Sequence, residues 1–246
     1  MPEIVFFDTE LDPRSGKILD IGAFREPDQP FHNSSLSEFK SFIMGSGIFS
    51  GHNIFHHDLK AIKAEIESVC RNPIYIDTLY LAPLLFPKIP YHRLLKDDKL
   101  QIDDLNNPLN DALKARQLFY DEVSTFNDLE DMLKEMYFRL LGPSNEFSAF
   151  FHFVNYQSST AASLEESIRE KFQGDICSNA PISSLIFEHP VSLAYCLSLI
   201  HVRDQYSIIP RWLSKTRPEV ESIMVLLRDK LCPSGCAYCN KALDIH

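Results

Sequence analysis

Two acidic residues near the start of the chain have the types and spacing of a divalent-metal site. Asp8 and Glu10 follow an apolar run, Ile4 to Phe7, that predicts a buried strand. Side chains at positions i and i+2 of a strand project from the same face, so the two carboxylates should converge. Two acids placed side by side are costly unless a cation or a proton lies between them. The pair therefore predicts a bound cation.

Two further acids lie at predicted helix starts. Asp58 begins one helix, and Asp111 lies in the first turn of another, which Asn107 and Pro108 open. Asn is a favoured N-cap residue, and Pro is favoured at the first helical position. Several oxygen donors with few soft ligands nearby suit Mg²⁺ or Mn²⁺ better than zinc. Taken one at a time, each of these acids has an ordinary structural explanation, such as a first-turn acid favoured by the helix dipole.

The elements that must position these acids predict an α/β fold. The chain has 246 residues, of which 45% are hydrophobic and 24% charged, as in globular proteins. We expect strands near 4–7, 18–24, 39–44, 48–53 and 74–76, the first two as an antiparallel hairpin, and helices at 55–69, 79–85 and from 108. After residue 125 the patterns are mainly helical, with helices expected at 128–141, 159–172, 190–200 and 219–231. The sequence thus predicts two parts, 1–125 and a helical accessory region at 126–246.

Four segments of the first part resemble the DEDD (DnaQ-like) 3′–5′ exonucleases. Residues 7–10 (Phe-Asp-Thr-Glu) and 18–22 (Ile-Leu-Asp-Ile-Gly) look like the first motif of that family. Residues 51–53 (Gly-His-Asn) with 58–59 (Asp-Leu) resemble the second, and 76–79 (Ile-Asp-Thr-Leu) match the segment that follows it. Residues 110–112 (Asn-Asp-Ala) with 118–119 (Leu-Phe) resemble the third. The resemblance covers residues 3–124, and its strength is the order of the segments, because a lone Asp-x-Glu is weak.

The resemblance implies a fold, two metal ions and a set of contacts. The fold would be an RNase H-like mixed sheet flanked by helices. Two Mg²⁺ or Mn²⁺ ions would activate a water and stabilise the leaving 3′ oxygen. The ligands implied are Asp8, Glu10, Asp58 and Asp111. The substrate contacts implied are Thr9 and Leu11, which would flank the 3′-terminal nucleotide, and Asn53.

The third motif departs from the family pattern at the position of the general base. One subclass has a His five residues before the last Asp, and the other has a Tyr four residues before it. This chain has Asn106 and Asn107 there, and neither amide accepts a proton near neutral pH, where general-base catalysis typically contributes about 10²–10⁴-fold. His92 is the predicted substitute. His56 and His57, beside the second-motif Asp, are the other candidates.

The resulting functional prediction is a metal-dependent 3′–5′ exonuclease on single-stranded or frayed DNA ends, with DNA repair as its setting. Two alternatives stay open: an RNA-trimming exonuclease of the same fold, and a degenerate domain that binds nucleic acid without cleaving it. The net charge of −10 excludes phosphate binding by bulk electrostatics, so contact must be local, with cations over the carboxylates. The resemblance also predicts a fused or associated helicase or polymerase.

Three cysteines near the C-terminus form a second candidate metal site. Cys232, Cys236 and Cys239 have C-x₃-C-x₂-C spacing, and His246 follows seven residues later. Such a set provides most of a tetrahedral zinc site, and a set of free thiols is the alternative. The other cysteines are predicted to be isolated core or surface thiols: Cys70, Cys177 and Cys196.

The chain carries no sequence signal for a membrane. No apolar run approaches the roughly 18 residues of a membrane helix. The first eight residues contain no basic segment of the kind that opens a signal peptide. We therefore expect a cytoplasmic protein with reduced cysteines.

Overall fold

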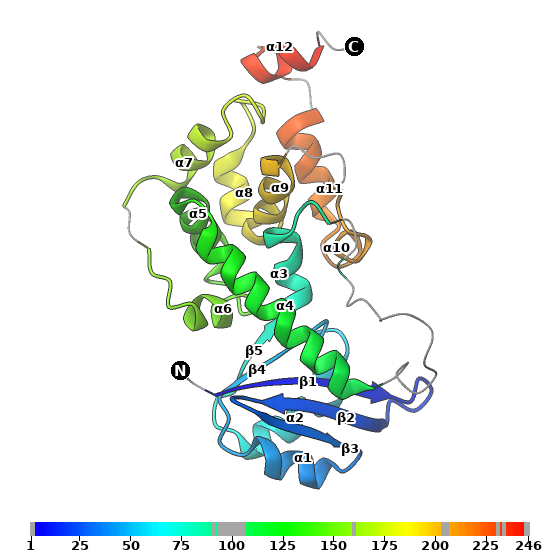
Figure 1. Ribbon diagram of the computed structural model, residues 1–246. Coiled ribbons are helices and arrows are strands. Elements are labelled where there is room, and N and C mark those ends of the chain that lie inside the picture. The colour runs from blue at the N-terminus through cyan, green and yellow to red at the C-terminus, as the bar shows by residue number, and fades with distance from the viewer. Residues whose placement is uncertain are drawn as a thin grey trace. The chain divides into compact units, whose positions relative to one another are not determined.

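The chain folds into two compact units. The computed structural model describes residues 3–89, 92, 107–158, 161–202, 207–229, 232 and 235–243. One unit comprises Met1–Leu81 and Arg93–Ser124, and the other comprises Ala82–His92 and Thr125–His246. The first unit contains the sheet, and helices make up the second (Figure 1). Residues 82–92, which the sequence grouped with the first part, belong to the second unit.

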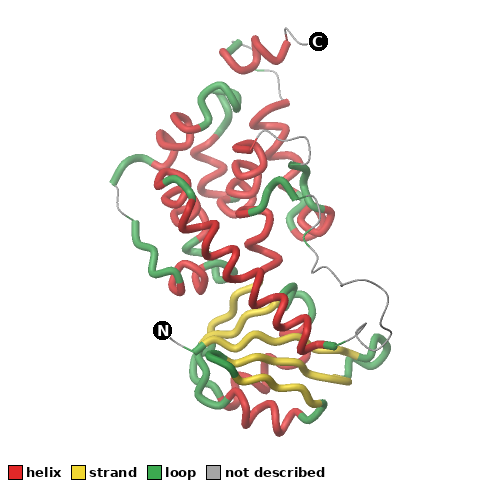
Figure 2. Tube along the Cα trace, viewed as in Figure 1, coloured by secondary structure: helices red, strands yellow, loops and turns green. Residues whose placement is uncertain are grey.

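The first unit is built on a five-stranded mixed sheet. Its strands are β1 (Ile4–Leu11), β2 (Ile18–Arg25), β3 (Gln29–Asn33), β4 (Ile48–Gly51) and β5 (Ile74–Asp77). Their order across the sheet is β3-β2-β1-β4-β5. The β1–β2 and β2–β3 pairs are antiparallel, whereas β1–β4 and β4–β5 are parallel. Figure 2 shows the strands of this sheet in yellow. The predicted hairpin and the α/β class are therefore confirmed, and the strand that carries the first two acids is central.

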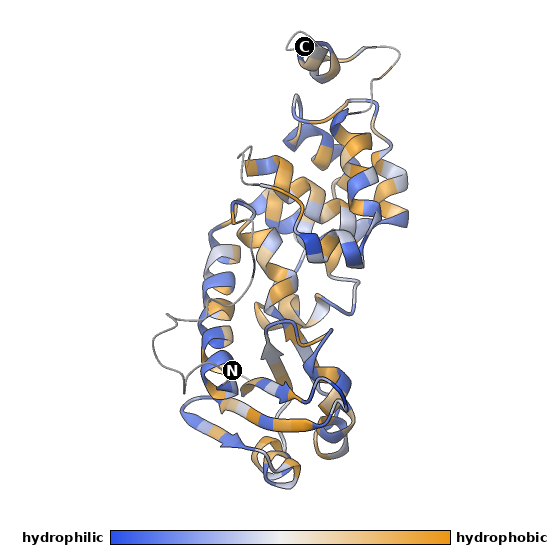
Figure 3. Cartoon of the chain, turned by 90° about the vertical axis from the view of Figure 1, so that its right-hand side faces the viewer, coloured by the Kyte–Doolittle hydropathy of each residue, from blue (hydrophilic) through white to orange (hydrophobic). Residues whose placement is uncertain are grey.

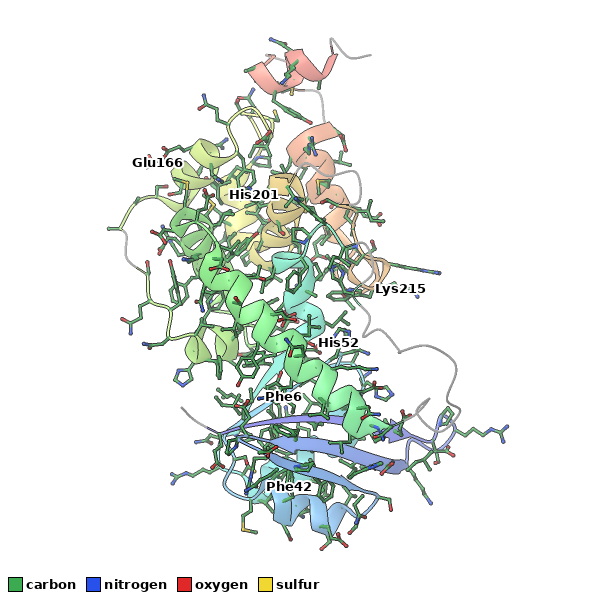
Figure 4. The ribbon with its side chains drawn as sticks, in the orientation of Figure 1. Phe6, Phe42, His52, Glu166, His201 and Lys215 are labelled. Carbon is green, nitrogen blue, oxygen red and sulfur yellow. The ribbon has the colours of Figure 1, made fainter. Side chains whose placement is uncertain are left out.

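Side chains of β1 alternate between the two faces of this sheet. The ring of Phe6 lies 5.6 Å, between centroids, from that of Phe119 in helix α4 (Pro108–Asp128). Phe7 points the other way, into a buried cluster with Ile62 of α2 (Asp58–Val69). Phe42 of helix α1 (Leu36–Ile43) is on that second side, opposite Phe6 (Figure 4). Asp8 and Glu10 lie two and four residues after Phe6, so their side chains project from the same face of β1 and face α4.

The predicted strand at 39–44 is wrong, because this segment belongs to helix α1. The side chain of Ser35 accepts a hydrogen bond from the N–H of Glu38 and caps the helix. Phe39 and Ile43, four residues apart, are both fully buried against the sheet. A strand would place Ser41 on the same face as these two residues, but Ser41 is exposed, so only the helical period fits. The third strand is instead β3, a segment with little apolar character.

Local capping signals fix the other helices of the first unit. Asn107 Oδ1 accepts the N–H groups of Leu109 (3.0 Å) and Asn110 (3.4 Å), which confirms the predicted N-cap of α4. Asp77 Oδ1 accepts the N–H of Leu79 at 3.0 Å near the start of α3 (Thr78–Leu85). Both caps satisfy N–H groups that the first helical turn leaves without a partner.

The second unit surrounds a central apolar helix. Residues 191–200 of α9 are all buried, and this helix packs against α5, α8 and α11 (Figure 1). The helices after α4 are α5 (Asp131–Leu141), α6 (Ser148–Phe153), α7 (Leu164–Lys171), α8 (Ile182–Glu188), α9 (Pro190–Val202), α10 (Arg211–Thr216), α11 (Glu219–Met224), the π-helical turn η2 (Val225–Asp229) and α12 (Ala237–Leu243). A helix that is apolar on all sides is expected at the centre of such a bundle.

The long helix α4 is amphipathic. Figure 3 shows hydrophobic and hydrophilic residues in alternating bands along it. Its buried positions include Ala115, Phe119 and Glu122, which recur at intervals of three or four residues. Among the described residues, no helix combines the length and the apolar character needed to cross a membrane.

Candidate metal centre

Three of the four predicted acids converge in the first unit. One carboxylate oxygen from each of Asp8, Glu10 and Asp111 lies within 4.8 Å of the others. All three residues are partly buried. Carboxylate oxygens held this close repel one another unless a cation lies among them. The set has the hard oxygen donors that Mg²⁺ and Mn²⁺ prefer, so these residues fit the predicted ion type.

Glycine at position 22 lets α4 approach the sheet closely enough to complete the set. Gly22 of β2 pairs directly with Asp8 of β1. A Cβ atom added to Gly22 would lie 1.9 Å from the backbone nitrogen of Leu109 and 2.0 Å from the carbonyl carbon of Pro108. The first turn of α4 therefore rests on Gly22, and Asp111 lies in that turn. Only a residue without a side chain permits this approach.

The fourth predicted ligand, Asp58, lies at the start of α2. It contacts β1 from the face of the sheet opposite the one that carries Asp8 and Glu10. Its Oδ1 accepts both the N–H and the hydroxyl hydrogen of Thr9, each at 2.7 Å. Asp58 and Thr9 are both buried. Thr9 lies between Asp8 and Glu10 on β1, so Asp58 fixes the strand beside the three-acid group. Whether Asp58 also binds a metal, and whether Thr9 contacts substrate, remain predictions.

A further buried acid, Asp77, supports the loop that carries the second motif. Its Oδ1 accepts the N–H of Asn53 at 2.7 Å and its Oδ2 accepts that of Phe55 at 3.0 Å. Burial raises the pKa of Asp77 to about 7, against the lowering effect of its N–H partners. Asn53, a predicted substrate contact, has a φ of 66° in this loop, a left-handed conformation that Asn tolerates.

Glu122, on the buried face of α4, is an acid whose carboxylate lacks hydrogen-bond partners in the described part of the chain. Both of its carboxylate oxygens are buried without a hydrogen-bond partner in the described part of the chain. Burial raises its pKa well above the usual 4.5, and the charge of Asp77 adds to the rise. A raised pKa in the folded state means that the folded chain binds more protons than the unfolded chain above pH 4.5. The free energy of unfolding is therefore highest while Glu122 is protonated, and it falls as the pH rises from 4.5 through the folded-state pKa.

Glu122→Met should raise the free energy of unfolding by about 1–3 kcal/mol at pH 8, since it removes a buried group that lacks a partner. The gain should be smaller at pH 5, where protonation already relieves the folded state. Urea unfolding at both pH values measures this difference. Asp121→Asn, which changes the exposed acid next to it on α4, removes only the smallest of the three contributions to this pKa and should have a much smaller effect at either pH. A loss of stability in Glu122→Met at pH 8 would contradict this account.

The three histidines considered as proton carriers have different surroundings. His56 Nε2 lies 2.9 Å from the hydroxyl of Tyr80. His57 Nδ1 is 3.7 Å from Asp58 Oδ1, which raises the pKa of this histidine, and the charge of Glu10 adds to the rise. His92 belongs to the second unit, where Nε2 is 3.4 Å from the carbonyl oxygen of Phe86, and burial lowers its pKa. A catalytic role for His92 stays a prediction.

The cysteine prediction requires one correction. Cys177, which the sequence indicated as an isolated thiol, lies with Cys232, Cys236 and Cys239 in a group whose sulfur atoms are all within 4.8 Å. No spacing rule links it to the other three, so no signal in the sequence identifies it. The fourth ligand considered earlier, His246, lies outside the described residues.

Two other predicted site positions are Leu11 and Asn106. Leu11, a predicted substrate contact, ends β1 just after a break in the β1–β2 register between Glu10 and Leu11. Such irregularities are common beside active sites, where they redirect a side chain. Asn106, the position of the missing general base, lies outside the described residues.

Known proteins give no independent guide to this site. Comparisons of the chain with protein families, curated proteins and solved structures find no match. The function must therefore be argued from the geometry of the site and from the motifs of the sequence.

Proposed function

We propose that the first unit is a metal-dependent 3′–5′ exonuclease that removes nucleotides from DNA 3′ ends. The observation that carries the proposal is the convergence of Asp8, Glu10 and Asp111 from two elements about a hundred residues apart in sequence. A nucleic acid is a polyanion, so three clustered carboxylates oppose its binding unless they hold cations. Metal-assisted phosphodiester hydrolysis explains both the cluster and its partial burial.

The sheet topology supports an RNase H-like assignment within this proposal. An antiparallel meander, β3-β2-β1, continues into two parallel strands, β4 and β5. Helix α4 covers the face of the sheet that carries the acids, and α1 and α2 cover the other face. The site is thus formed by the central strand and by one covering helix, both of them rigid elements of the kind that position catalytic groups well.

The residues of the site have distinct tasks in the proposed reaction. Bound divalent ions would supply an activated water and stabilise the charge on the leaving 3′ oxygen. Asp8, Glu10 and Asp111 would hold them, and Asp58 would keep β1 in place through Thr9. The N-terminus of α4 lies beside the acids, and the partial positive charge of a helix N-terminus favours a phosphate.

His57 would assist by binding phosphate rather than by accepting a proton. The carboxylate of Asp58, 3.7 Å from the ring, raises the pKa of His57, which keeps a larger fraction of the imidazole protonated near neutral pH. A protonated imidazole donates from both nitrogens and cannot act as a base. The side chain is half exposed, so an oxygen of the substrate can reach it.

The test is a nuclease assay on the complete chain. Single-stranded DNA, single-stranded RNA and a duplex with a recessed 3′ end, each labelled at the 5′ end, would be incubated with Mg²⁺ or Mn²⁺. We expect a ladder that shortens from the 3′ end, fastest on single-stranded DNA, and no cleavage with EDTA. Faster shortening of RNA would move the substrate class to the RNA-trimming alternative.

The binding-only alternative predicts a different result from the same samples. Nucleic acid would bind in the presence of Mg²⁺ without shortening, even at high protein concentration. Metal binding without any cleavage of the three substrates would overturn the exonuclease proposal. Degradation that Asp8→Asn does not reduce would indicate a contaminating nuclease.

A further inference from the structure

Four thiols in the second unit meet although they come from two distant segments. Cys177 lies in the loop between α7 and α8, and Cys232, Cys236 and Cys239 lie before and within α12. Their sulfur atoms all lie within 4.8 Å of one another, and Sγ of Cys236 is 3.9 Å from Sγ of Cys177. All four are free cysteines, and two of them, Cys177 and Cys239, are buried.

The backbone around the three later cysteines turns so that their side chains converge. The N–H of Gly235 donates to the carbonyl oxygen of Cys232 at 3.0 Å, and Gly235 has a φ of 62°, a left-handed conformation suited to glycine. This turn directs Cys236 back toward Cys232. Helix α12 then places Cys239 three residues further on, on the same side. The N–H of Cys239 also donates to Sγ of Cys236 at 3.4 Å.

Cys177 is held in place by the helical unit itself. Its N–H donates to the carbonyl oxygen of Leu227 in η2 at 2.7 Å, and its carbonyl oxygen accepts the N–H of Ala180 at 3.0 Å. A second contact ties α12 to η2: Arg228 Nε donates to the hydroxyl of Tyr238 at 3.2 Å. The cysteine group therefore joins three parts of the second unit, namely the α7–α8 loop, η2 and α12.

The distances favour a single tetrahedral metal ion over a disulfide or a cluster. A disulfide would bring two sulfur atoms to about 2.0 Å. Tetrahedral zinc has Zn–S bonds of about 2.3 Å, which puts neighbouring sulfurs about 3.8 Å apart. The 3.9 Å between Cys236 and Cys177 matches the zinc geometry. An iron–sulfur cluster places several atoms between its thiolates and spreads them farther apart than one ion does.

We propose that Cys177, Cys232, Cys236 and Cys239 bind a single zinc ion that fastens α12 to the α7–α8 loop. Four protein ligands fill a tetrahedral shell and leave no open position for water or substrate, so the ion is structural rather than catalytic. Without the ion, α12 keeps the Arg228–Tyr238 contact as its tie to η2. The site belongs to the second unit, so the zinc proposal does not depend on the nuclease proposal.

The test measures metal content and thiol chemistry in the complete chain. Protein purified without added chelator should contain about one zinc per chain by elemental analysis. Replacement of zinc by Co²⁺ should give the visible absorption of a tetrahedral cobalt–thiolate centre. Cys177→Ser should weaken zinc binding by at least about 100-fold, because loss of an outer-shell partner alone costs 10–100-fold.

Cys196→Ser is the matched control. Cys196 is equally buried in the second unit, but its sulfur contacts the carbonyl oxygen of Val220 rather than the cysteine group. This variant should keep its zinc and its cobalt spectrum. A metal-free wild-type chain that fails to take up zinc would overturn the proposal. So would brown iron absorption in place of zinc, or a Cys177→Ser variant with unchanged zinc affinity. The wild-type metal measurements decide the matter even if the variant misfolds.

Discussion

Asp8→Asn should slow removal of the 3′-terminal nucleotide by at least about 1000-fold. The amide keeps the size of the side chain but removes a negative charge from the three-acid group. A metal ion supplies several kcal/mol of transition-state stabilisation, and each 1.36 kcal/mol corresponds to a factor of ten in rate. The quantity to measure is kcat/KM on a 5′-labelled oligonucleotide at saturating Mg²⁺.

Two controls separate loss of chemistry from loss of fold. Asp121→Asn makes the same chemical change on the exposed side of α4 and should leave kcat/KM within about twofold, since surface substitutions away from special features have small effects. In EDTA, Asp8→Asn should be at least as stable as the wild type, because it removes repulsion between neighbouring acids. The rise in Tm that Mn²⁺ gives the wild type should be absent. An unchanged rate would place the chemistry elsewhere.

Gly22→Ala should both destabilise the first unit and strongly slow hydrolysis. The added Cβ would lie about 2 Å from backbone atoms of Pro108 and Leu109, which no side-chain rotation relieves. Either β2 or the first turn of α4 must move, and Asp111 moves with that turn. Overpacking of this kind typically costs about 1–3 kcal/mol, occasionally more. We expect a loss at the upper end of that range, together with a fall in kcat/KM of more than about 100-fold.

Gly47→Ala is the control for the glycine substitution itself. No atom lies within 4 Å of a Cβ placed there, and no positive φ is recorded for this residue. It should leave stability and rate close to the wild-type values. If Gly22→Ala cleaves DNA as fast as Gly47→Ala does, the position of α4 on β2 does not control the site.

The sequence predicted best where the signal is local. The β1–β2 hairpin and the Asn107 cap both follow from neighbouring residues, and so does the shared face of Asp8 and Glu10. The error at 39–44 was also local. Phe39 and Ile43 fit a helical period and Ser35 offers a cap, but the short apolar run also fits a strand.

What the sequence could not predict depends on contacts between distant segments. Cys177 lies 55 residues before Cys232, and only the packing of α7, α8 and η2 brings them together. The charge environment of Glu122 was equally hidden, because an acid on an amphipathic helix normally faces solvent. Asp58 was identified as an acid of the site, yet its two bonds to Thr9 became visible only with the fold.

The position of β1 at the centre of the sheet has a consequence for the growing chain on the ribosome. Asp8 emerges 103 residues before Asp111, a delay of about 5–20 s at ordinary rates of synthesis. The hairpin can pair during that time, whereas the parallel partner β4 arrives later. A nascent chain therefore has two of the three clustered carboxylates and no complete ligand set. If the first unit is the proposed nuclease, the order of translation itself should keep the unfinished protein inactive.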